Sequence, residues 1–93
     1  MLGVISKSFV IRNKAGLHAR SASLFVENAN MFTSEVYVLK GKTRANAKSI
    51  LGVFALGVYK DDEITLEIDG DDESVAIEHM GNLIDSKFFL EEE

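Results

Sequence analysis

A short segment near residue 65 alternates apolar and polar side chains, and this alternation limits the possible folds more than any other feature. The apolar residues are Ile64, Leu66 and Ile68, and the polar residues Thr65 and Glu67 lie between them. Because successive side chains of a strand point to opposite faces, the pattern predicts a strand with one buried face and one wet face. The fold must therefore cover one face of a sheet and leave the other in water.

The rest of the chain divides into strand-like and helix-like segments. Strands are predicted over 5–11 and 35–39 and around Thr43, and helices over 19–29, after Ser49 and over 72–88. The predicted order is β-α-β-β-α-β-α. Periodicity alone leaves two arrangements open: an open-faced sandwich with its helices on one face of an antiparallel sheet, and a ferredoxin-like split βαβ arrangement.

Composition limits the class of protein. With 93 residues, no proline and no linker-like segment, we expect one domain over residues 1–93. The net charge of −5 argues against binding to nucleic acid.

The longest nearly apolar run, 50–59, is about half of the ~20 residues that a membrane span needs. We expect a cytoplasmic protein without membrane insertion, and the absence of cysteine fits a reducing compartment.

The run from Gly16 to Arg20 is the strongest candidate for chemistry. Gly16 permits an unusual backbone conformation, and His18 then stands at or just before the start of the helix predicted over 19–29. The first N–H groups of a helix have no helical partner and attract anions. A neutral imidazole can attack phosphorus as a nucleophile, and the Arg20 cation can neutralise the negative charge of the phosphoryl group. The expected phosphate ligands are the backbone of Ala19 and Arg20 and the guanidinium of Arg20.

Two other clusters are weaker candidates for metal binding. Asp69, Asp71, Asp72 and Glu73 lack the later glycine and glutamate of a calcium loop, and we expect them to cap a helix or face water. His79 has no second histidine at ligand spacing. We therefore expect no metal and no cofactor.

Two motifs at a fixed separation support a family resemblance. Gly-Leu-His-Ala-Arg at 16–20 is followed by Lys-Ser-Ile-Leu-Gly-Val at 48–53 and Leu-Gly at 56–57. The chain resembles the HPr phosphocarrier family of the bacterial sugar phosphotransferase system over nearly its whole length. This resemblance implies an α+β open-faced β-sandwich, with a four-stranded antiparallel sheet and helices packed on one face.

The resemblance also implies a function. His18 would accept a phosphoryl group on Nδ1 from enzyme I and pass it to a sugar-specific enzyme IIA, with Arg20 stabilising the group in transit. The protein would be a carrier rather than an enzyme that turns over alone. The expected partner-binding side chains are those of Leu17, Ile50, Leu51 and Phe54.

Ser49 allows two interpretations. On the residues alone, its hydroxyl caps the helix that follows. In similar members of the family, the matching serine is phosphorylated by an HPr kinase/phosphorylase, and the modified form binds a catabolite-control repressor. Two alternatives to the sugar carrier therefore stay open: an HPr-like paralogue for nitrogen or operon-specific regulation, and a regulatory binding module that depends on phosphorylated Ser49.

The chain departs from the family in two places. Ser21 stands where HPr proteins usually have proline, which predicts a looser junction or a firmer hold on phosphate. Glu27 and Asn28 stand where basic residues often meet acidic partners, which predicts either weaker electrostatic steering toward enzyme I or a partner with a less acidic face than usual.

Overall fold

The computed structural model describes residues 4–90, and its elements follow the predicted order. The elements are β1 (Ile5–Val10), α1 (Ala19–Ala29), β2 (Glu35–Lys40), β3 (Thr43–Asn46), α2 (Ile50–Leu56), β4 (Glu63–Asp69), α3 (Glu73–Asp85) and the 3₁₀ turn η1 (Lys87–Phe89). Over residues 4–90, no helix is long and apolar enough to cross a membrane.

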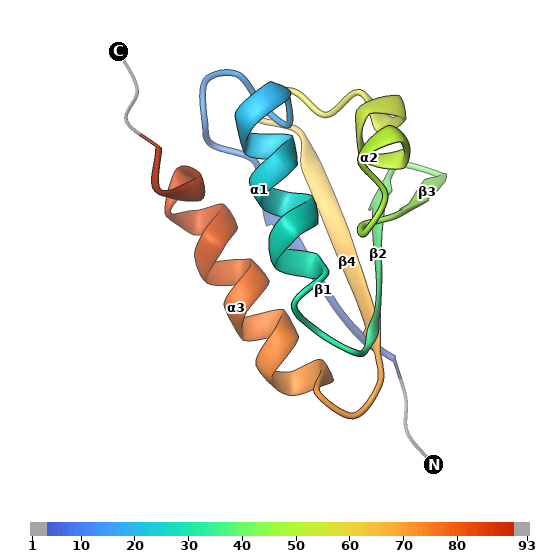
Figure 1. Cartoon of the computed structure of the whole chain (residues 1–93). Coiled ribbons are helices and arrows are strands. Elements are labelled where there is room, and N and C mark those ends of the chain that lie inside the picture. Colours follow the sequence, from blue (N-terminus) through green and yellow to red (C-terminus); the bar gives the residue numbers. More distant parts are fainter. Residues whose placement is uncertain (1–3, 91–93) are drawn as a thin grey trace.

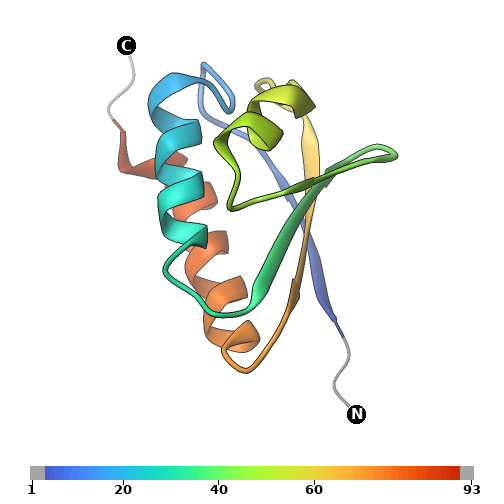
Figure 2. The same cartoon turned by 45° about the vertical axis from the view of Figure 1, so that its right-hand side comes forward.

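The four strands form one antiparallel sheet in the order β1-β4-β2-β3. The three helices lie on one side of it (Figure 1), and Figure 2 shows the sheet's other side uncovered. This arrangement is the predicted open-faced α+β sandwich, and it decides between the two arrangements that periodicity left open.

The alternation in β4 has the predicted consequence. Ile64, Leu66 and Ile68 are fully buried, whereas Thr65 and Glu67 are half-buried on the opposite face. Because β4 lies inside the sheet between β1 and β2, its apolar side chains form the centre of the core. Burial of this kind is the main stabilising contribution in a domain of this size.

The C-terminal end of α3 differs from the prediction. The helix ends at Asp85 rather than continuing to Phe88, because Lys87, Phe88 and Phe89 have positive φ angles of 57°, 61° and 56°. Phe88 is nevertheless buried, and its ring meets that of Phe25 at a centroid distance of 6.5 Å. The spacing of apolar residues over 72–88 therefore predicted the burial of Phe88 correctly. However, a left-handed turn rather than a continued helix brings this side chain into the core.

Candidate functional site

His18 stands at the N-cap of α1, as predicted. Its backbone is extended, with φ −145° and ψ 142°, and its side chain is exposed. Ala19, the first helical residue, has a φ of 44°, in the left-handed region that disfavours residues other than glycine. Non-glycine residues in this conformation cluster at functional sites. The N–H groups of the first turn of α1 follow directly after the imidazole.

The segment before His18 is seated on the loop that follows α2. The Leu17 N–H donates to the Val58 carbonyl at 3.0 Å. Gly16 has a φ of 68°, and a Cβ at this position would lie 2.5 Å from the Val58 carbonyl oxygen. Only glycine allows both the turn and this close approach.

Ser21 ties this segment to the first turn of α1. Its hydroxyl donates to the Gly16 carbonyl at 2.5 Å and accepts from the His18 N–H at 3.1 Å. The side chain is only 2% exposed. The serine at this position therefore points into the protein rather than toward a bound phosphate. Its hydrogen bonds fasten the junction where the family usually has proline, and the predicted looser junction stays a prediction.

Arg20 is exposed on the first turn of α1. Among residues 4–90, no carboxylate forms an ion pair with its guanidinium. Arg20 also lines a groove of about 490 Å³ between α1 and α3, together with Leu24, Leu83 and Phe88. The guanidinium is thus not neutralised by a carboxylate in the described part of the chain.

Helix α2 brings the second motif close to His18. The Phe54 ring lies 6.5 Å from the His18 ring, centroid to centroid. Leu51 is 77% exposed and Phe54 44% exposed, whereas Ile50 is half-buried against the core. Leu17 is only 4% exposed. Its side chain belongs to the core and presents almost no surface to a partner, so the predicted partner contact of Leu17 finds little support in its burial.

Ser49 caps α2 as the simpler interpretation predicted. Its Oγ accepts from the Gly52 N–H at 3.2 Å. The side chain is half-buried.

A hollow of about 370 Å³ opens beside His18. Its base includes the buried side chains of Leu17 and Val58, and Phe54 and Tyr59 stand on its walls. Tyr59 is 67% exposed. Sequence reasoning did not identify Tyr59, because no motif or spacing connects it to the run that contains His18.

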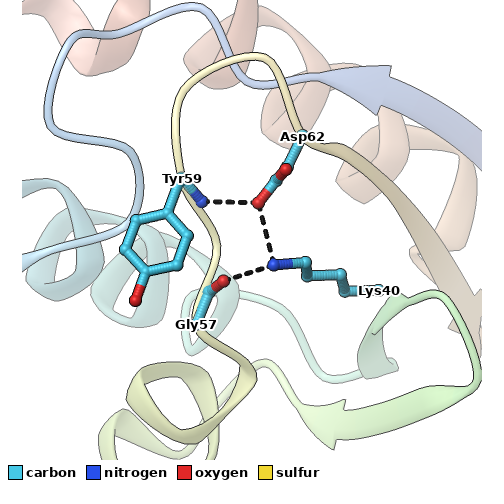
Figure 3. Close-up of polar contacts among 4 residues, drawn as sticks. All are labelled: Lys40, Gly57, Tyr59 and Asp62. Carbon is cyan, nitrogen blue, oxygen red and sulfur yellow. Dashed lines mark hydrogen bonds and ion pairs between the residues drawn. The ribbon is translucent and has the colours of Figure 1, made fainter.

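Lys40 and Asp62 hold the backbone of this wall (Figure 3). The Lys40 ammonium donates to the Gly57 carbonyl at 2.5 Å and lies 2.9 Å from Asp62 Oδ2. The same carboxylate oxygen accepts from the Tyr59 N–H at 2.8 Å. The hydrogen bond from Lys40 and then the bond from Tyr59 lower the pKa of Asp62. The Lys40 ammonium also lies 5.3 Å from the centre of the Tyr59 ring.

The acidic loop before α3 has a structural role. Asp72 stands at the N-cap of α3, yet its carboxylate does not cap that helix. It accepts from the Thr33 N–H at 2.9 Å, from the Ser34 N–H at 3.0 Å and from the Ser34 hydroxyl. These bonds, that of the Ser34 hydroxyl first, lower the pKa of Asp72 to about 2. The carboxylate thus joins the start of α3 to the loop between α1 and β2.

No metal centre is found in the described part of the chain. Within 4–90, no group of three or more His, Asp or Glu side chains is arranged to hold an ion. The Nε2 of His79 lies 2.7 Å from Asn28 Oδ1, and its ring packs against Phe32 at a centroid distance of 5.3 Å. His79 therefore connects α3 to α1.

Comparisons with known proteins agree with this geometry. Residues 5–86 match the family model PTS-HPr, described as the PTS HPr component phosphorylation site. The phosphocarrier protein HPr of Neisseria meningitidis is 42% identical over 85 residues, which cover 91% of this chain and 96% of that protein. The HPr-like protein Crh of Bacillus subtilis is 43% identical over 77 residues, or 83% of this chain and 91% of Crh.

A solved structure is also similar along its whole length. The crystal structure of HPr-C-His from Thermoanaerobacter tengcongensis has a TM-score of 0.92 and 44% identity, and the match covers 95% of this chain and 99% of that one. From its fold, its motifs and these matches, the chain belongs to the HPr family of phosphocarrier proteins of the phosphotransferase system.

Proposed function

We propose that His18 is the phosphorylated residue of a carrier that takes a phosphoryl group from enzyme I and passes it to a sugar-specific enzyme IIA. The observation that carries this proposal is the exposed imidazole at the N-terminus of α1, beside an arginine with no ion-pair partner among residues 4–90. Enzyme I obtains the group from phosphoenolpyruvate, and the carrier works in the cytoplasm. It does not turn over alone.

The transfer exchanges one P–N bond for another. The Nδ1 of His18 attacks phosphorus while the bond from phosphorus to the donor histidine breaks, and the reverse exchange delivers the group to enzyme IIA. Arg20 and the N–H groups of Ala19 and Arg20 neutralise the charge on the phosphoryl oxygens. A site that only hydrogen-bonds the group, without a metal clamp, holds it loosely enough to pass it on.

The docking surface of this carrier consists of Ile50, Leu51 and Phe54. Exposed apolar side chains next to a reacting group are typical of protein interaction sites. Phosphorylation of Ser49 by an HPr kinase/phosphorylase would add about two negative charges inside this surface. It would hinder docking of an acidic partner and provide a new contact for a catabolite-control repressor.

Similarity to Crh favours a second candidate function. In this alternative, the chain is an HPr-like paralogue that serves nitrogen or operon-specific regulation, with the same chemistry at His18 and different partners. A binding module that depends on Ser49 alone is less well supported, since both His18 and Arg20 are present and exposed.

The deciding experiment is phosphorylation with phosphoenolpyruvate and a catalytic amount of enzyme I, followed by intact mass. We expect one added phosphoryl group that is labile in acid and stable in alkali. His18→Ala should abolish the label. His79→Gln is the matched control, because His79 is the chain's other histidine and stands in α3. An unlabelled wild-type chain beside an active control HPr would overturn the proposal.

A further inference from the structure

One loop, residues 57–62 between α2 and β4, holds the end of the segment that leads to His18. The Leu17 N–H donates to the Val58 carbonyl at 3.0 Å. A Cβ on Gly16 would lie 2.5 Å from the same carbonyl oxygen, so the two backbones are in direct contact. Because His18 follows Leu17 directly, the position of the imidazole depends on the position of this loop.

The other end of the loop holds the start of the same segment. The Ile11 N–H donates to the Asp62 carbonyl at 2.9 Å, and the Asp61 N–H donates to the Ile11 carbonyl at 2.7 Å. Asp61 has a φ of 74°, in the left-handed region that residues other than glycine seldom adopt. A backbone of this kind persists only where the surrounding contacts fix it. The loop therefore needs support of its own to keep the segment in one place.

Lys40 supplies this support from β2. Side chains at alternate positions of a strand share a face, and Lys40 follows the buried Val36 and Val38 in this alternation. The Lys40 side chain is only 32% exposed, so its ammonium group requires partners within the protein. The ammonium donates to the Gly57 carbonyl at 2.5 Å and lies 2.9 Å from Asp62 Oδ2 (Figure 3). It thus joins the first and the last residue of the loop.

Asp62 extends this support into the middle of the loop. The Oδ2 atom that pairs with Lys40 also accepts from the Tyr59 N–H at 2.8 Å. The Asp62 N–H in turn donates to the Tyr59 carbonyl at 3.0 Å. One carboxylate therefore fixes both the lysine and the turn that follows Val58.

We propose that Lys40 and Asp62, called the clamp below, are positioning residues for phosphoryl transfer. The clamp fixes the loop 57–62, and the loop holds the His18 imidazole where it can attack phosphorus. This inference rests on the proposed function. A displacement of about 1 Å in a reacting group can reduce a rate by about 10²-fold. An ion pair whose side chains are 32% and 30% exposed adds little to stability, so its effect should be seen in the rate.

The kinetics of transfer from phosphorylated enzyme I test the clamp. Lys40→Met keeps the apolar stem and removes the ammonium, whereas Asp62→Asn keeps the shape and removes the charge. Each should lower kcat about tenfold and leave KM within about twofold, because the surface that meets enzyme I is unchanged. The double variant should be about as slow as the slower single variant, since either substitution opens the same clamp.

Arg44→Met and Glu67→Gln are the matched controls. They break the ion pair that joins β3 to β4, in which Arg44 Nε lies 3.5 Å from Glu67 Oε1. They also change the net charge in the same way as the two clamp variants. Both controls should retain the wild-type kcat and KM. An equal loss of kcat in the controls would mean that net charge sets the rate, and would contradict the clamp.

Hydrogen exchange provides a second measurement, which needs no partner. In Lys40→Met, the Leu17 amide should exchange about tenfold faster, because the loop that accepts its hydrogen bond is released. The Leu66 amide should keep its wild-type rate, since β4 is paired with a strand on each side at this residue. An unchanged Leu66 rate also shows that the variant is folded.

Three results would overturn the inference. The first is a wild-type kcat, or an unchanged Leu17 exchange rate, in both single variants while His18 is still phosphorylated. This result leaves the proposed function intact. The second is a raised KM with unchanged kcat, which would make Lys40 a contact of enzyme I rather than a positioning residue. The third is a wild-type chain that takes no phosphoryl group beside an active control HPr, in which case the proposed function fails as well.

Discussion

At the scale of single residues, Ser21 fixes the junction between the loop that carries Gly16 and the start of α1 by hydrogen bonds. Its hydroxyl accepts the His18 N–H and donates to the Gly16 carbonyl, which also accepts from Asn13 Nδ2 at 2.5 Å. The junction that presents His18 is thus held by side-chain hydrogen bonds rather than by a proline ring. We therefore expect the local geometry to depend on the Ser21 hydroxyl.

Ser21→Ala should destabilise the protein by about 1–3 kcal/mol, because the His18 N–H loses its acceptor. Urea unfolding measures this change. Ser23→Ala is the matched control, since Ser23 is an exposed serine of the same helix and its loss should change stability by less than about 0.5 kcal/mol. Equal effects of the two substitutions would refute a special role for the Ser21 hydroxyl.

Arg20 is expected to act on the rate and not on stability. Its exposed guanidinium has no ion-pair partner in 4–90, so Arg20→Ala should leave the unfolding midpoint unchanged. The rate of phosphoryl transfer should fall about 10²-fold, as when one fixed charge-stabilising donor is removed elsewhere. Arg44→Ala removes the same charge from the open face of the sheet and should retain the wild-type rate. A near-wild-type rate for Arg20→Ala would remove Arg20 from the mechanism.

At the scale of elements, Asp72 connects the start of α3 to the loop before β2. Its pKa is lowered from 3.8 to about 2, so its ionised form is bound more tightly in the folded protein than in the unfolded chain. The resulting stabilisation is fully present above about pH 4 and is lost as the pH falls toward 2. Asp72→Asn should reduce this part of the acid-induced loss of stability in unfolding titrations. Asp71→Asn, at an exposed neighbour, should leave the profile unchanged.

The packing of α3 against β1 depends on a glycine in α3, Gly81, which leaves room for the Phe9 ring of β1. A Cβ on Gly81 would lie 2.9 Å from the Phe9 ring. Gly81→Ala should therefore destabilise the fold, because overpacking costs about 1–3 kcal/mol and exceeds the gain of up to ~1 kcal/mol in helix propensity. Gly52→Ala in α2 is the control, since its Cβ would have ordinary contacts at 3.5 Å. Calorimetry should show a lower Tm for the Gly81 variant and no loss for the Gly52 variant.

At the scale of the whole molecule, α2 and the start of α1 come from distant parts of the chain and lie at the same end of the molecule (Figure 1), where the Phe54 ring lies 6.5 Å from the His18 ring. Ser49→Asp places a charge inside the proposed docking surface. Aspartate is a good N-cap, so the unfolding midpoint should not fall. Transfer to His18 should slow by about tenfold, because the charge opposes desolvation and repels an acidic partner.

Ser74→Asp is the matched control for this prediction. It adds the same charge near the start of another helix, α3, at an exposed residue. Transfer kinetics of the two variants with enzyme I distinguish a local effect on docking from an effect of net charge. Similar slowing in both variants would mean that Ser49 has no special place in the docking surface.

The sequence by itself determined the order of the elements and the position of His18. The alternation in β4 and the helical period from Ala19 to Ala29 are local patterns, and burial of one face follows from them directly. The N-cap position of His18 is equally local, because it depends only on where the apolar period begins.

Only the tertiary structure decided which residues surround the imidazole. Leu17 turns inward because it pairs with Val58, and Lys40 reaches Tyr59 and Asp62 only because β2 passes beside the loop that follows α2. These contacts join segments far apart in the chain. The local sequence pattern predicts which face of its own helix or strand a side chain occupies. It does not predict which residues of other elements pack against that side chain.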